Sequence, residues 1–147
     1  MRIGEIDIPS ELLDAQRAGK LVVFAGAGVS MGPPANYRDF RGLVRQIGHG
    51  SDVKRESADE PSERYLGRLE SAGVKVHVLA RQLLTNPKSK PNHLHSSLVR
   101  LFLANGGPRI VTTNFDDHFT AEATRLLPGT EVYKAPALPV GSRFAGL

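Results

Sequence analysis

Two short apolar runs, at residues 21–25 and 109–113, constrain the fold of this chain more than any other feature. Each run is continuous and rich in β-branched residues, and glycine or polar residues follow it at once. Such runs are typical of strands that are buried on both faces of a parallel sheet. Parallel strands need a crossover connection, and the segments between these two runs carry helical periodicity. The sequence therefore predicts an α/β fold, with helices on both faces of a parallel sheet.

Helical periodicity and chain-breaking residues indicate where the other elements lie. Residues 11–17 follow Ser10, which we expect to cap this first helix, and Gly19 ends it. Apolar residues recur at helical spacing in several later segments. We expect further helices at 39–47, 63–72, 76–84, 92–104 and 116–127, a surface loop that could be mobile at 49–62, and a short third strand at 131–133.

The length of 147 residues is enough for one domain with a real core, and we expect a single domain over residues 1–147. Hydrophobic residues make up 40% and charged residues 23%, which suits a globular chain rather than a disordered one. The tail at 135–147 has two prolines, two glycines and no periodicity, so we expect it to be extended or disordered.

The composition excludes several kinds of site. There is no cysteine, so disulfides and thiolate metal sites cannot form, and we expect no metal. The N-terminus lacks the apolar segment of a signal peptide, and the run at 21–25 is too short to span a bilayer. The net charge of +4 comes from scattered Lys and Arg residues, so we do not expect this chain alone to bind nucleic acid. These features favour a cytoplasmic protein without a membrane segment.

A glycine-rich segment, Gly26-Ala27-Gly28-Val29-Ser30, leaves the first predicted strand. Glycines there let the backbone turn sharply and approach a pyrophosphate, and the N-terminus of a following helix favours an anion. The usual dinucleotide pattern needs a third glycine where Met31 stands, and the Gly-Lys-Ser/Thr of ATPases is missing. A tight turn that binds no ligand is the alternative interpretation.

A polar block, Thr-Thr-Asn-Phe-Asp-Asp-His at 112–118, follows the second predicted strand. Polar side chains are costly to bury unless they are hydrogen-bonded. Asn114 or Asp116 could simply cap the next helix. Alternatively, an amide at a strand end can orient a water or a ribose hydroxyl, and a nearby carboxylate can stabilise developing positive charge.

Together these segments resemble the sirtuin superfamily, in particular its bacterial branch of sirtuin-like NAD hydrolases. The family's Gly-Ala-Gly-(Ile/Val)-Ser motif is matched at 26–30, and its catalytic Gln-Asn-(Ile/Val)-Asp motif appears as Thr-Asn-Phe-Asp at 113–116. Its Pro-Asp-Phe-Arg segment is matched by Asp-Phe-Arg at 39–41, with altered spacing from the preceding proline. Its Pro-x-x-x-His-x-x-Leu stretch is matched at 91–98.

The resemblance implies a Rossmann-like sheet in an incomplete sirtuin-like domain that binds NAD. Asn114 would position the ribose or an attacking water, and Asp116 would support the nicotinamide side. His95 is expected to be structural. The implied NAD-binding residues are Gly26, Ala27, Gly28 and Ser30 at the phosphates, Phe40 and Arg41 near the nicotinamide ribose, and Thr112 and Thr113 beside the polar block.

Two departures from the family bear on the activity. Without cysteine, the zinc module of the deacylases cannot form. No His-Gly pair, which holds the family's catalytic histidine, follows Asn114, and the tail at 141–147 resembles the approach to it. We therefore expect the N-terminal portion of a domain that stops before this pair. His118 falls on the following helix, so we do not expect it to be the base.

The function that the resemblance favours is NAD hydrolysis at the nicotinamide–ribose bond, as in bacterial antiphage defence. Such a domain would work with a partner protein or a sensor domain, or as a homo-oligomer. An NAD-dependent deacylase and a non-catalytic module that binds NAD or ADP-ribose are the alternatives.

Overall fold

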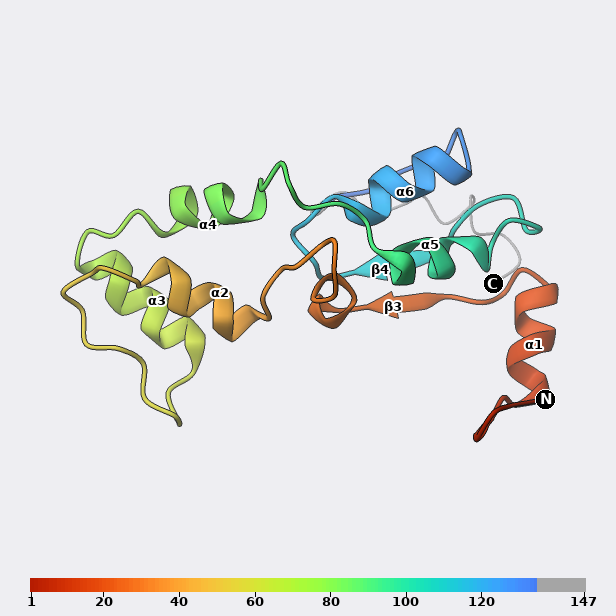
Figure 1. Cartoon of the computed structure of the whole chain (residues 1–147), viewed down its shortest axis with the longest axis horizontal. Coiled ribbons are helices and arrows are strands. Elements are labelled where there is room, and N and C mark those ends of the chain that lie inside the picture. The colour runs from red at the N-terminus through yellow and green to blue at the C-terminus, as the bar shows by residue number, and fades with distance from the viewer. Residues whose placement is uncertain (135–147) are drawn as a thin grey trace. The chain divides into compact units, whose positions relative to one another are not determined.

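The computed structural model describes residues 1–134, and over these residues the protein is mixed α/β (Figure 1). By its internal contacts the chain divides into two compact units, each assembled from separate segments. The first unit contains Met1–Ala25, His93–Thr112 and the part that begins at Asp117. The second unit contains Gly26–Asn92 and Thr113–Asp116. The single domain expected over residues 1–147 stays a prediction, and the expected tail at 135–147 lies outside the described residues.

The first unit begins with a hairpin and a short helix. Strands β1 (Arg2–Ile3) and β2 (Ile6–Asp7) pair antiparallel, and helix α1 (Ser10–Arg17) follows them. The expected cap at Ser10 is wrong, because Ser10 is already helical and Pro9 occupies the N-cap position without a side-chain hydrogen bond. The Ser10 hydroxyl instead donates to the Glu11 carboxylate at 3.3 Å.

The sheet of the first unit is a parallel pair, as predicted. Strand β3 (Val23–Ala25) pairs with β4 (Ile110–Thr112), and Phe24 lies opposite Val111. The prediction that both strands are buried on both faces is wrong, because Phe24 is 79% exposed and Val111 is 48% exposed. A continuous apolar run cannot reveal how many layers will cover a strand.

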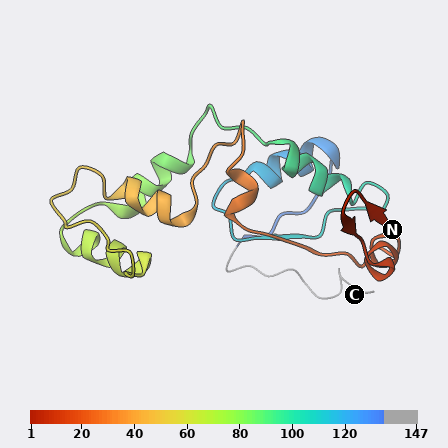
Figure 2. The same ribbon diagram turned by 60° about the horizontal axis from the view of Figure 1, so that its bottom comes forward.

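Helices α5 (His93–Arg100) and α6 (His118–Leu126) pack against each other and lie on the same side of β3 and β4 in both views (Figures 1 and 2). The expectation of helices on both faces is therefore not met within the described residues. Helix α5 is also shorter than predicted, because the chain beyond Arg100 continues in turns that hydrogen-bond three residues back, such as Phe102 to Val99. The predicted strand at 131–133 is wrong, since this segment has no regular structure.

The second unit is helical. Helices α2 (Phe40–Ile47), α3 (Ser62–Ser71) and α4 (Val76–Leu84) match the predicted ranges within one residue at each end. The Asp39 carboxylate caps α2 by accepting a hydrogen bond of 2.7 Å from the Gly42 amide, as its position before an apolar helical pattern suggests. The three helices enclose a core of buried side chains: Val44, Ile47, Tyr65, Leu69 and Val76.

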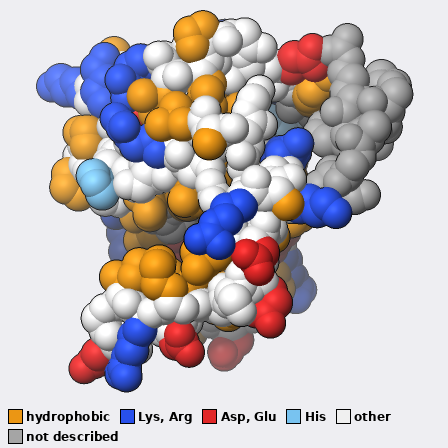
Figure 3. Space-filling model, turned by 90° about the vertical axis from the view of Figure 1, so that its right-hand side faces the viewer, with side chains coloured by type: hydrophobic (Ala, Val, Ile, Leu, Met, Phe, Trp, Pro, Cys, Tyr) orange, Lys and Arg blue, Asp and Glu red, His pale blue; other side chains and the backbone are white. Residues whose placement is uncertain are grey.

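Some hydrophobic side chains remain at the surface. Figure 3 shows a face of the molecule on which they reach solvent between Lys and Arg side chains. In the N-terminal hairpin Ile3 is 57% exposed and Ile6 is 69% exposed, because a two-stranded hairpin has no second layer. Single exposed apolar side chains are usual in folded proteins. No helix in residues 1–134 is both long enough and apolar enough to cross a membrane.

Candidate functional site

The glycine-rich segment lies in the second unit and forms a single tight turn. Residues Ala27–Ser30 make the 3₁₀ helix η1, and Gly26 before it has an extended backbone, with φ −104° and ψ −175°. The next α-helix does not begin until Phe40. The expected helix N-terminus behind this segment is therefore wrong, because one four-residue turn does not build the dipole of a longer helix.

The backbone around Gly26 and Gly28 is open. A Cβ atom placed on either glycine would meet no heavy atom within 4 Å, and neither residue has a positive φ. The fold itself would therefore accept a side chain at both positions. Glycine at these positions leaves room directly beside exposed backbone.

The turn ends at Ser30, which joins the glycine-rich segment to the polar block. The Ser30 side chain is buried, with 1% of the residue exposed. Its hydroxyl donates a hydrogen bond of 2.8 Å to the Asp116 carboxylate. The Asn114 side-chain amide donates a hydrogen bond of 3.1 Å to the Ser30 hydroxyl oxygen. Three of the predicted site residues thus meet in one network, which we call the Ser30 cluster: Ser30, Asn114 and Asp116.

The alternative interpretation of the polar block as a helix cap is wrong. Helix α6 begins at His118 and its N-cap position is Asp117, which makes no capping hydrogen bond with its side chain. The Asp117 carboxylate instead pairs with Lys134 at 2.8 Å. Asn114 and Asp116 lie before the cap position and bond to Ser30.

One residue that sequence reasoning missed supports this arrangement. Asn92 is 6% exposed, and its side-chain amide donates hydrogen bonds to the carbonyls of Val29, at 2.7 Å, and Gly32, at 3.2 Å. It therefore holds the end of η1 from a segment 60 or more positions away. The only local signal was its place between Pro91 and the start of α5. That place predicts a helix cap rather than hydrogen bonds to distant backbone carbonyls.

One local and two long-range hydrogen bonds hold the segment that follows η1. The Tyr37 amide donates to the Ser30 carbonyl at 2.9 Å, and the Tyr37 hydroxyl donates to the Leu84 carbonyl at 2.6 Å. The Ser89 hydroxyl donates to the Ala35 carbonyl at 2.7 Å. The chain after the glycine-rich turn is thus tied to α4 and to the segment that precedes α5.

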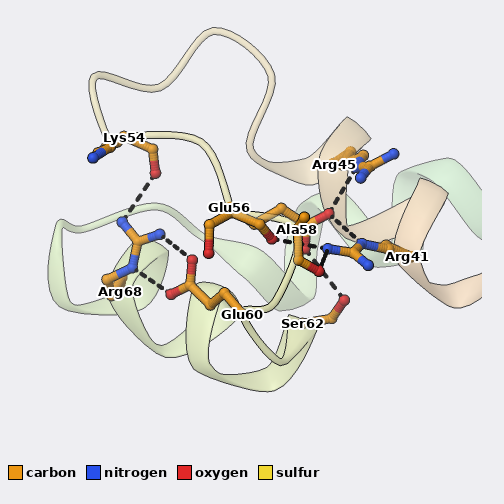
Figure 4. Close-up of polar contacts among 9 residues, drawn as sticks. Arg41, Arg45, Lys54, Glu56, Ala58, Glu60, Ser62 and Arg68 are labelled. Carbon is orange, nitrogen blue, oxygen red and sulfur yellow. Dashed lines mark hydrogen bonds and ion pairs between the residues drawn. The ribbon is translucent and has the colours of Figure 1, made fainter.

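Phe40 and Arg41, expected near the nicotinamide ribose, lie in the first turn of α2. Phe40 is 40% exposed. The Arg41 guanidinium donates to the Glu56 carboxylate at 3.0 Å and to the carbonyls of Ser57 and Ala58 at 2.9 and 2.8 Å (Figure 4). In this structure Arg41 holds the loop between α2 and α3, and its role beside a ribose stays a prediction.

The two threonines expected at the NAD site are both exposed. Thr112 is the last residue of β4 and belongs to the first unit, where it pairs with Ala25. Thr113 opens the short segment of the second unit that carries Asn114 and Asp116.

His95 and His118, the last residue of the polar block, pack together within the first unit. The His95 and His118 rings meet edge to face with centroids 5.3 Å apart, and Phe119 lies 4.8 Å from His95. His95 is fully buried and His118 is 8% exposed. Within residues 1–134 there is no group of three or more His, Cys, Asp or Glu side chains placed to hold a metal ion.

Comparison of the chain with known proteins identified no relative. No protein-family model, curated protein or solved structure matches the chain. The functional argument therefore depends on the residues of the Ser30 cluster and on the open turn beside it.

Proposed function

We propose that this chain is an NAD-binding domain of the Rossmann-like, sirtuin-like kind, which acts on the nicotinamide–ribose bond of NAD. The observation that carries the proposal is the shared hydroxyl of Ser30. It joins the glycine-rich turn to Asn114 and Asp116, which lie 84 and 86 positions further along the chain. The resemblance assigns these two segments to the phosphates and to the nicotinamide ribose of one dinucleotide.

The open glycines support a phosphate-binding role for the turn. A glycine that no turn geometry or packing contact requires leaves space for something outside the chain. Gly26 and Gly28 both fit this description, since a Cβ at either would meet no neighbour and neither φ is positive. Exposed backbone N–H groups without adjacent side chains suit a pyrophosphate.

Within this proposal Ser30 positions other side chains rather than binding phosphate. Its single hydroxyl proton is donated to Asp116, and its oxygen accepts from Asn114. Asn114 orients the ribose or an attacking water. The Asp116 carboxylate stabilises the positive charge that builds on the ribose as the bond to nicotinamide breaks.

A second candidate function is a module that binds NAD or ADP-ribose without cleaving it. The observation that favours it is the position of His118, the histidine nearest to Asn114 in sequence. His118 is 8% exposed and its ring packs against His95 in the first unit. A packed imidazole of this kind is poorly suited to exchange protons with a substrate.

The test measures NAD binding by calorimetry and nicotinamide release by chromatography, with the 147-residue chain and with a C-terminally extended chain that includes a His-Gly pair. NAD hydrolysis predicts release that falls on the order of a hundredfold in Asn114→Ala, because a preorganised polar group is lost from the reacting centre. Gln46→Ala removes an exposed amide from α2 in the same unit and serves as the matched control.

The alternatives give different results. Binding without release by the extended chain favours the non-catalytic module. NAD-dependent turnover of an acyl-lysine peptide would indicate a deacylase. Absence of NAD binding at millimolar concentration would contradict both forms of the proposal.

A further inference from the structure

The loop between α2 and α3 is anchored on both sides of Arg55 (Figure 4). On one side, the Glu56 carboxylate is almost fully buried, with 2% of its side chain exposed. It accepts hydrogen bonds from the Nε atoms of Arg41 and Arg45 at 3.0 and 2.7 Å, and Ser62 donates to it at 3.3 Å. Burial raises the pKa of Glu56, but the two guanidiniums outweigh that effect and hold it below its usual value.

On the other side, Arg68 holds the backbone of Lys54. Its Nη1 atom donates to the Lys54 carbonyl at 2.9 Å. The same guanidinium forms a two-pronged pair with the Glu60 carboxylate, at 2.9 and 2.8 Å. Residues 54 and 56 are thus both fixed, so the exposed side chain of Arg55 projects from a tethered backbone rather than from a free loop.

Arg55 lines two cavities of the second unit. One has a volume of about 420 Å³ and includes Arg45, His49, Glu56 and the edge of the buried Tyr65. The other has a volume of about 400 Å³, and its charged lining residues are Lys54, Arg55, Asp59, Glu60, Arg64 and Arg68. Both are open to solvent, the second more than the first, so a small ligand could reach their lining residues.

The charges around Arg55 favour an anion. The only carboxylate of the first cavity, Glu56, is already paired with two arginines. The second cavity is lined by four cations and two carboxylates, and without the Glu60–Arg68 ion pair three cations and one carboxylate remain. Guanidinium groups bind phosphate through paired N–H donors, which makes arginine the preferred side chain for this kind of ligand.

We propose that the two cavities around Arg55 form a binding site for a small molecule that carries linked phosphate groups. No residue that lines either cavity belongs to the Ser30 cluster or to the glycine-rich turn. This site does not depend on the proposed NAD chemistry.

The test is an NMR titration of the isotope-labelled full chain with inorganic pyrophosphate and, separately, with inorganic phosphate, at constant ionic strength. We expect saturable shifts of the amide signals of residues 49–56, with pyrophosphate binding about tenfold more tightly than phosphate because it can engage both cavities. Arg55→Ala should weaken pyrophosphate binding by about tenfold or more, because a charge-assisted hydrogen bond is lost.

A control variant shows whether binding is specific to the cavities around Arg55. Arg81→Ala removes an exposed arginine of α4 that lines neither cavity, and it should leave the affinity unchanged. Shifts that do not saturate, an equal loss in Arg81→Ala, or saturable shifts at residues 26–30 without shifts at residues 49–56 would overturn the proposal.

Discussion

The hydroxyl of Ser30 and the carboxylate of Asp116 are hydrogen-bonded at 2.8 Å, although the two residues lie 86 positions apart in the sequence. Ser30 is 1% exposed and Asp116 is half-buried, so this contact is partly shielded from water. Such a polar contact is costly to break, because each partner would be left without the solvation it had in the unfolded chain. The Ser30 side chain thus helps to fix the position of the glycine-rich turn relative to the polar block.

Ser30→Ala should destabilise the protein by about 1–3 kcal/mol, because it removes the donor to Asp116 and the acceptor for Asn114 from a buried network. Urea unfolding followed by circular dichroism measures the change. Ser71→Ala is the matched control, since the Ser71 hydroxyl bonds only to the Gly67 carbonyl on the exposed face of α3 among the described contacts. If both variants lose the same stability, the Ser30 cluster does not hold the two segments together.

Asn92→Ala should loosen the glycine-rich turn specifically. The variant loses the amide that donates to the Val29 and Gly32 carbonyls. Hydrogen exchange should therefore become faster at the amides of residues 29–32, with a loss of about 1–3 kcal/mol in local stability. Asn86→Ala, which removes a side chain that bonds only to the nearby Lys88 amide among the described contacts, is the control. Unchanged hydrogen-exchange protection at residues 29–32 would show that the Asn92 side chain does not stabilise the turn.

Glu122 should make the protein sensitive to acid. The Arg125 guanidinium, 2.9 Å from the carboxylate, together with the Ser96 hydroxyl outweighs the burial of this group and lowers its pKa from 4.5 to about 2. A carboxyl with a lowered pKa in the folded state contributes stability above pH 4.5, and this contribution is lost as the pH falls from 4.5 towards 2.

We expect this loss to be about 1–2 kcal/mol, smaller than the full shift implies, because the Arg125 side chain is 58% exposed to solvent. Urea unfolding at pH 7, 4.5 and 3 measures it. Glu122→Gln should be less stable at pH 7 and should flatten the pH dependence over this range. If the free energy of unfolding of Glu122→Gln depends on pH as steeply as that of the unaltered protein, other groups cause the acid sensitivity.

Gly48→Ala should destabilise the core of the second unit by about 1–3 kcal/mol through overpacking. An added Cβ would lie 2.2 Å from the Tyr65 hydroxyl oxygen and 2.8 Å from the ring carbon that bears it. Tyr65 is 2% exposed and belongs to the core cluster of the second unit, so moving its ring away from the added Cβ would disturb the packing of that core. Thermal unfolding measures the effect.

Gly67→Ala provides the opposite case within the same unit. Gly67 lies inside α3, and a Cβ there would meet no heavy atom within 4 Å. This variant should gain about 0.5–1 kcal/mol, because alanine loses less backbone entropy than glycine on forming a helix. Destabilisation of similar size in both variants would mean that Tyr65 does not set the requirement for glycine at position 48.

The helices of the second unit were predictable because their signals are local. Asp39 caps α2 from the adjacent position, and Gly48 follows its last turn. The extent of α5 was not predictable in the same way. Its apolar spacing continues to Phe102, yet the helix ends at Arg100 and turns follow. Periodicity identifies a buried face but does not distinguish an α-helix from a series of turns.

Of the candidate site, the sequence predicted the residues but not their contacts. Ser30, Asn114 and Asp116 were recognisable by their place in two motifs. Asn92 was not recognisable, because nothing near it indicates that its amide reaches the carbonyl of Val29. Arg41 was expected at the site, whereas the structure shows its guanidinium on the loop at Glu56.

By itself, the sequence of this protein determined the order of its main local elements: a glycine-rich segment after one strand, a polar block after another and helices between them. Only the tertiary structure decided that Ser30 bonds to Asp116, that one face of β3 and β4 carries exposed Phe24 and Val111, and that Arg55 lies between two anchored neighbours. Capping and periodicity depend on residues a few positions apart. A hydrogen bond across 86 positions depends on the path of the whole intervening chain, which no local pattern encodes.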